Sequence, residues 1–442
     1  MKISKPVLFA LVVSMSLPVC AEDLMDIYRS AQTQDTEFAA AMATLRAGQE
    51  KLPQGRALLL PSVMLTANST FNDMTVSYDT SPPPLPAGSY KYNSHGYSVN
   101  LTQPLFRPQS WLAYSEAELQ VAQAEIKFRG AQQDLILRVA EAYFDVLIAQ
   151  DAVDLAGAQK TAIGEQLQQA RRNFEVGTAT ITDTYEAQAR FDLTNAQEIA
   201  AQSNVEIKKR TLQQLTNAVP DELQRLGKDL NLDPLQPEDV EKWEADAQQY
   251  SLQLALAQVG AQLAEKEVIR NRNGHLPSAD IVASYNKSTA NGGSYGVGSD
   301  TLAKSIGVQL SVPLYQGGVI NSRLREAEAN SDLSRQELEG ARRVVARQTR
   351  EAYLGVVSGL AQVKALQQAL KSSNSLLDAS KLGQEVGVRT NLDVLNAQQQ
   401  HYSTRRDLYQ AEYKFLVSQL RLKAAVGTLA EEDLVKVNQS LH

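Results

Sequence analysis

The sequence predicts a mainly α fold with transmembrane β-strands, in which a unit of helix, β-hairpin and long helical hairpin occurs twice. Three observations support this prediction: a proline-free, helix-periodic segment of about 65 residues from Ser110 to Phe174, two pairs of alternating stretches, and motifs repeated at a constant offset of 210 positions. One helix of that length is roughly 100 Å long, which exceeds an ordinary globular domain and indicates a coiled-coil assembly.

The start of the chain carries the features of an export signal. A positively charged beginning and a short apolar run precede Val19-Cys20-Ala21, so residues 1–21 are expected to be a signal peptide and the mature chain to begin at Glu22. Lipidation of Cys20 is the alternative, although Val19 suits it poorly. Removal of residues 1–21 leaves no cysteine, which excludes disulfides and thiol chemistry.

The first repeat is expected to span 22–219. Short helices at 23–31 and 36–57 precede a β-hairpin at about 61–104, whose strands of about ten residues approach the length of a tilted membrane strand and end at Pro104. A polar, proline-rich loop joins the two strands. The helical hairpin follows at about 110–217. Alternation gives the hairpin one apolar face, formed by Val63, Leu65, Ala67, Tyr97, Val99 and Leu101.

The second repeat is expected to span 246–428, with a β-hairpin at about 277–313 and a helical hairpin at about 317–427. Between the repeats, prolines and acidic residues indicate a short irregular insertion at 220–245. Residues 429–442 form a separate C-terminal segment. The helical motifs recur at the same offset over some 70 residues, which chance does not explain; these pairs are Glu141-Ala142-Tyr143 with Glu351-Ala352-Tyr353, and Ala187-Gln188 with Ala397-Gln398.

Each helical hairpin reverses through a related tip, at 175–183 and 385–393. Gly177 and Gly387 suit the left-handed conformation that ends a helix. Thr180 or Thr182 is expected to cap the first return helix, and Thr390 or Asn391 the second. The two tips are expected to close one end of a channel.

The strands require partners from other chains. Four strands do not close a wide barrel, and an open edge in lipid leaves backbone groups unpaired. Three copies supply twelve strands, which lies within the range of outer-membrane barrels. The alternative is a soluble periplasmic coiled-coil scaffold or adaptor in which the two hairpins pack on each other.

Several short motifs, in this order and spacing, resemble the outer membrane efflux and type I secretion protein family over the whole mature chain. They are Gly274-His275-Leu276-Pro277, Val312-Pro313-Leu314-Tyr315-Gln316-Gly317-Gly318, Val386-Gly387-Val388-Arg389-Thr390, Asp393-Val394-Leu395 and Ala425-Val426-Gly427-Thr428-Leu429. The resemblance implies a homotrimer with a twelve-stranded barrel in the outer membrane of a Gram-negative bacterium and a twelve-helix barrel through the periplasm. It also implies that 220–245 and 429–442 form an equatorial belt.

The same resemblance implies a passive exit duct of tripartite multidrug efflux and type I secretion. Periplasmic adaptor (membrane fusion) proteins and inner-membrane ABC, RND or MFS transporters are the implied partners. Contacts between the tips are implied to hold the duct closed, with Arg389 meeting Asp183 and Thr182. Gln384 stands where the family carries a tyrosine of this network. A solvated Arg389 of little energetic value is the alternative.

Asp393 is implied to form a ring that narrows the lumen, and Asn396 stands where many relatives carry a second acidic ring. Repulsion between three Asp393 carboxylates is expected to raise their pKa, and the ring is expected to attract cations. The alternative is that Asp393 caps the return helix. The implied adaptor-docking residues lie at the tips: Val176, Gly177, Thr178, Val386, Gly387, Val388 and Thr390.

Nothing in the sequence supports an enzyme, a cofactor or a nucleic-acid partner. The four histidines are scattered without metal-ligand spacing. No phosphate-binding loop or nucleophile motif occurs. The formal charge of −7 and the absence of a dense basic run exclude a nucleic-acid footprint. Energy for transport is therefore expected from a partner protein.

Overall fold

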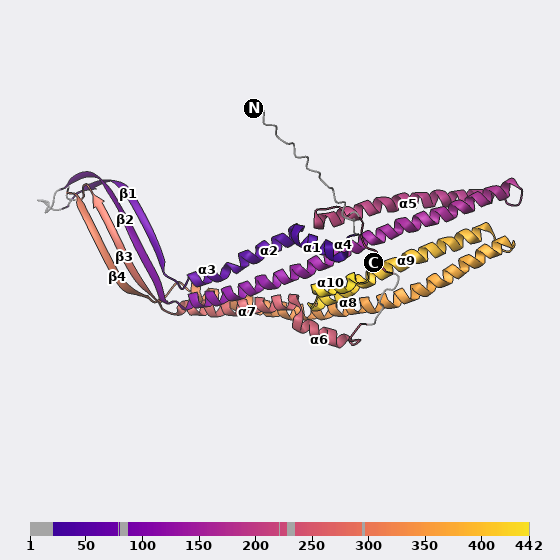
Figure 1. The fold of residues 1–442 in the computed structure, drawn as a ribbon. Helices are drawn as coiled ribbons and strands as arrows, with labels where there is room; N and C mark the ends of the chain where they lie inside the picture. Colours follow the sequence, from indigo (N-terminus) through magenta and orange to yellow (C-terminus); the bar gives the residue numbers. More distant parts are fainter. Residues whose placement is uncertain are drawn as a thin grey trace, which may run out of the picture.

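The computed structural model describes residues 21–77, 79, 87–220, 222–227, 235–293 and 297–441. Nearly all of the expected signal peptide, most of the proline-rich loop and part of the expected insertion lie outside the described residues. The molecule is elongated, with a β-sheet at one end and the tips of two helical hairpins at the other (Figure 1).

The sheet is antiparallel and has the order β1-β2-β3-β4. The strands span Ser62–Val76, Gly88–Phe106, Ser278–Ala290 and Ser299–Ser311. Strands β1 and β2, with 15 and 19 residues, exceed the expected ten, and β3 and β4 have 13 residues each. Strand β2 also continues past Pro104, where a register shift accommodates a residue that lacks a backbone N–H donor.

Cross-strand register joins the apolar faces of the two hairpins. Val63 pairs with Leu101, Leu101 with Ala283, and Ala283 with Ile306. Directly opposed residues share a face, so this apolar row crosses all four strands. The side chains at the two ends of the row, Val63 and Ile306, are 65% and 81% exposed. A single chain therefore presents one continuous apolar sheet face.

Two long helical hairpins extend from the sheet: α4 (Pro108–Glu175) with α5 (Ile181–Thr216), and α8 (Val319–Glu385) with α9 (Asn391–Val426). The duplication is visible in these bounds, because α5 and α9 begin and end 210 positions apart. Left-handed caps follow both return helices, at Asn217 and Gly427. Among the described residues, no helix combines the length and apolar character needed to cross a membrane.

Shorter helices lie along the hairpins: α1 (Leu24–Gln34), α2 (Thr36–Gln49), α3 (Lys51–Ala57), α6 (Val240–Tyr250), α7 (Leu252–Arg272), the 3-10 turn η1 (Asn273–His275) and α10 (Glu431–Asn438). The helix expected over 36–57 is interrupted at Glu50, which ends α2 and precedes α3. Helix α6 begins inside the expected insertion at 220–245, so the end of that segment is helical.

The main core surrounds the middle of α4. Tyr143 and Phe144 are almost fully buried there, together with Tyr413 of α9 and Leu434 of α10. The Tyr143 hydroxyl donates to the Gln224 carbonyl at 2.8 Å, which fastens the segment at 222–227 to the same place. The two hairpins are thus packed firmly together midway along their length.

Candidate functional site

The two hairpin tips have nearly the same hydrogen bonds. In the first tip, Gly177 has φ +78° and the Thr178 N–H donates to the Asn173 carbonyl at 2.8 Å. In the second tip, Gly387 has φ +82° and the Val388 N–H donates to the Gly383 carbonyl at 2.9 Å. Both glycines therefore end a helix in the left-handed conformation.

A reciprocal cap begins each return helix. Thr180 and Thr390 are the N-cap residues, and the Thr182 and Asn391 alternatives are wrong. The Asp183 carboxylate accepts from the Thr180 N–H at 2.9 Å and the Asp393 carboxylate accepts from the Thr390 N–H at 2.9 Å. The threonine hydroxyl accepts in turn from the backbone N–H of each aspartate. Each aspartate thus caps its helix from the third position.

Arg389 is the main difference between the tips, since Ala179 occupies the equivalent position. The Arg389 N–H donates to the Gly383 carbonyl at 3.0 Å, and its side-chain stem crosses Gly383, where an added Cβ would lie 2.6 Å from Arg389 Cγ. The guanidinium Nη1 lies 3.8 Å from Asp393 Oδ1. Gly383 thus makes room for Arg389, and Arg389 remains 54% exposed.

Within one chain, Arg389 faces Asp393 of its own tip. In the described part of the chain, Arg389 forms neither a hydrogen bond nor an ion pair with Asp183 or Thr182. Asp183 is occupied by its cap, and Thr182 is exposed on the first turn of α5. Gln384 donates from Nε2 to Asn391 Oδ1 at 3.3 Å.

The pKa of Asp393 lies below its ordinary value. Hydrogen bonds from the Thr390 N–H and hydroxyl are the main cause, and the Arg389 charge acts in the same direction. The expected repulsion between three Asp393 carboxylates requires three subunits and does not act within a single chain. Inside the chain, the cap favours the charged form of Asp393.

The expected docking residues are accessible. Val176, Val386 and Val388 are 73%, 66% and 76% exposed. Gly177 and Gly387 have nothing within 4 Å of the place a Cβ would occupy. The tips therefore present small, uncovered apolar surfaces to solvent.

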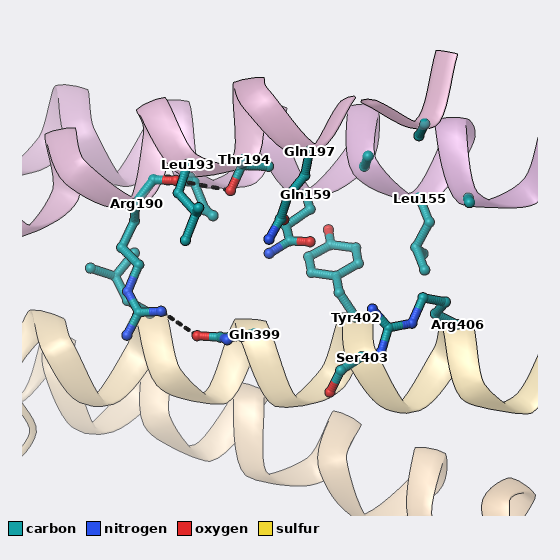
Figure 2. Close-up of a pocket in the computed structure, with 15 residues that line it drawn as sticks. Leu155, Gln159, Arg190, Leu193, Thr194, Gln197, Gln399, Tyr402, Ser403 and Arg406 are labelled. Carbon is teal, nitrogen blue, oxygen red and sulfur yellow. Dashed lines mark hydrogen bonds between the residues drawn. The ribbon is translucent and has the colours of Figure 1, made fainter. Parts of the chain in front are cut away.

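Sequence reasoning missed Arg190 of α5, which joins the two hairpins. Its Nη2 donates to Asn396 Oδ1 at 3.0 Å. Its Nη1 donates to Gln399 Oε1 on the same helix α9, and Figure 2 shows this second bond. Asn396 therefore accepts from an arginine of the other hairpin. No local pattern indicated this contact, because its partners lie 206 and 209 positions away.

Among the described residues, no group of three or more His, Cys, Asp or Glu side chains could hold a metal ion. The tips thus combine capped helix ends with an exposed polar contact between Arg389 and Asp393.

A family model described as outer membrane efflux protein matches residues 27–218 and 243–428. The chain is 34% identical over 438 residues to the outer membrane protein TolC of Vibrio cholerae, a match that covers 97% of this chain and 96% of that protein. It is also 34% identical over 418 residues to the alkaline protease secretion protein AprF of Pseudomonas aeruginosa, covering 93% and 85% of the two chains.

Solved structures share the fold at lower identity. The Campylobacter jejuni CmeC outer membrane channel superposes with a TM-score of 0.79 at 16% identity, covering 95% of this chain and 90% of that one. The outer membrane protein VceC of Vibrio cholerae gives a TM-score of 0.77 at 18% identity, covering 91% and 96%.

Proposed function

The chain belongs to the outer membrane efflux protein family, and we propose that three copies form a single exit duct that crosses the outer membrane and continues through the periplasm. The chain is a channel of the outer membrane and serves efflux or secretion. We propose further that the duct is a trimer, in which the strands form a twelve-stranded barrel and the long helices form a twelve-helix barrel.

The observation that carries the proposal is the sheet. Its apolar row runs across all four strands, and β1 and β4 form its two edges. In lipid, the apolar face has a favourable environment but the unpaired backbone groups of the edges do not. Pairing β4 of one copy with β1 of the next satisfies these groups, and three copies bring the strand number into the range of outer-membrane barrels.

The tips form the gate in this proposal. Arg389 is more than half exposed, so its guanidinium can turn from Asp393 toward Asp183 and Thr182 of another tip in the trimer. Asp393 lines the constriction, with Asn396 as its uncharged neighbour one turn further. Docking of a periplasmic adaptor at the exposed valines separates the tips, and an inner-membrane ABC, RND or MFS pump supplies the energy.

Conductance of the purified protein in planar lipid bilayers tests the duct and its gate. Small, cation-preferring pores are expected. Arg389→Ser is expected to enlarge them, because a contact of up to about 1 kcal/mol is lost in each of three subunits. Thr182→Ala and Asp183→Asn should resemble Arg389→Ser, and unchanged pores in all three variants would refute the gate contact.

A matched substitution tests the constriction. Asp393→Asn is expected to weaken block by divalent cations while leaving an oxygen for the helix cap. Asp183→Asn removes the equivalent capping charge from the other tip and also enlarges the pores in this proposal. Weakened block with Asp393→Asn but not with Asp183→Asn therefore assigns the block to Asp393 rather than to pore size. The soluble scaffold is excluded if the protein requires detergent for release from membranes.

A further inference from the structure

The contacts between the hairpins change in character along the molecule. Near the middle, the Tyr413 hydroxyl on α9 donates to Asp151 Oδ2 on α4 at 2.8 Å, and the Tyr413 and Phe144 rings lie 5.6 Å apart. Tyr413 is only 3% exposed, so this level is a packed core. Tyr413 therefore attaches α9 to the first hairpin at this level.

Toward the tips, a cavity of about 280 Å³ separates α9 from α4 and α5. Figure 2 shows Arg190 beside this cavity, with Gln159, Gln197 and Tyr402 projecting from its walls. Leu395 supplies apolar packing at this level, where it contacts the first hairpin. The cavity therefore leaves part of the α9 surface unpacked next to the place where Arg190 bonds to α9, beside the buried Leu395.

The hydrogen bonds from Arg190 to Asn396 and Gln399 are called the α5–α9 link. Both acceptors are neutral amides on exposed side chains, so water can replace Arg190 at little cost. A carboxylate acceptor would form a stronger, charge-assisted bond. The two-armed geometry nevertheless fixes the position of α9 relative to α5 while the link is present.

We propose that Arg190 is a positioning residue of the gate, which holds α9 against α5 in the closed duct and releases it when the tips separate. This inference rests on the proposed duct function. One contact that controls the opening of the duct then lies between the two hairpins of one chain rather than at the tips themselves. Asn396 acts as a hydrogen-bond acceptor in that contact.

Bilayer conductance of the full-length trimer tests the link. Arg190→Ala is expected to raise the open fraction about two- to five-fold per subunit, as expected for loss of one exposed polar contact. The charge-neutral double variant Asn396→Ala with Gln399→Ala is expected to give the same rise. Adding Arg190→Ala to the double variant should have no further effect, and Arg190→Lys should restore part of the closed population.

Arg171→Ala is the matched control. Arg171 Nη2 donates to Gln188 Oε1 at 2.7 Å, but this bond joins α4 to α5 inside one hairpin. Its loss removes the same kind of group at a similar level and should leave the open fraction unchanged. Melting temperatures of the Arg190 and Arg171 variants should agree, so that conductance alone distinguishes a gate contact from a structural one.

The possible outcomes distinguish failure of the α5–α9 link from failure of the proposed duct function. Normal pores that do not respond to Arg190→Ala would overturn the link alone. A response to Arg190→Ala but not to the double variant would assign the effect to charge in the pore and would also overturn it. Absence of pores from the unsubstituted protein would contradict the duct function and, with it, any gate role for Arg190.

Discussion

Gly427 offers a direct test of how the second hairpin is attached to the rest of the chain. It ends α9 with φ +89°, and a Cβ at this position would lie 2.2 Å from the Tyr250 carbonyl oxygen and 3.0 Å from Ser251 Cα. Tyr250 and Ser251 form the corner between α6 and α7. The C-terminal end of α9 therefore presses directly on another backbone.

Gly387 provides the comparison. Its φ of +82° is similar, but nothing lies within 4 Å of its missing Cβ. Gly387→Ala should cost only the left-handed strain, about 1–2 kcal/mol. Gly427→Ala adds a steric overlap with backbone, which typically costs about 1–3 kcal/mol in a packed interior. The expected total for Gly427→Ala is about 2–5 kcal/mol.

Thermal unfolding, followed by circular dichroism in detergent at one heating rate, measures both variants. Gly427→Ala should melt well below Gly387→Ala, and Gly387→Ala slightly below the unsubstituted protein. Equal melting temperatures for the two variants would refute the close contact between the end of α9 and the α6–α7 corner.

Two further predictions concern the fold around the main core. Asp35→Ala should destabilise the protein by about 3–5 kcal/mol, because this 4% exposed carboxylate accepts from the Phe38 N–H and from Arg138; Asp134→Ala, which removes an exposed partner of Arg138, should cost less than about 1 kcal/mol in the same denaturation assay. Burial raises the pKa of Glu412 from 4.5 to about 7. The folded state then holds this proton more tightly than the unfolded chain, so the contribution of Glu412 to stability should be greatest below about pH 4.5 and should be lost between about pH 4.5 and about pH 7. Glu412→Gln should flatten that decline in melting temperature, and an unchanged pH profile would contradict the assignment.

Periodicity and the duplication predict much of the fold. The offset of 210 relates the bounds of α5 and α9 in the structure, because the similar sequences at 175–183 and 385–393 form matching caps at both tips. Local sequence patterns predicted the boundaries of α2, α3 and β2 less well. Glu50 lies within a helical pattern but separates α2 from α3, and β2 continues through Pro104 because the sheet accommodates a register shift there.

The candidate site was predictable only in part. Gly177 and Gly387 are identified by sequence because the turn requires φ above zero. Arg190 was not identifiable in this way, since its partners belong to the other repeat and its own equivalent position holds Gln400. The role of Gly383 also depends on the path of the Arg389 side chain, which no spacing rule gives.

Native mass spectrometry of the protein released from outer membranes in detergent bears most directly on the trimeric duct. The account predicts a complex with the mass of three mature chains, since the edges β1 and β4 need sister strands in lipid. A stable single chain that stays in solution without detergent would contradict it.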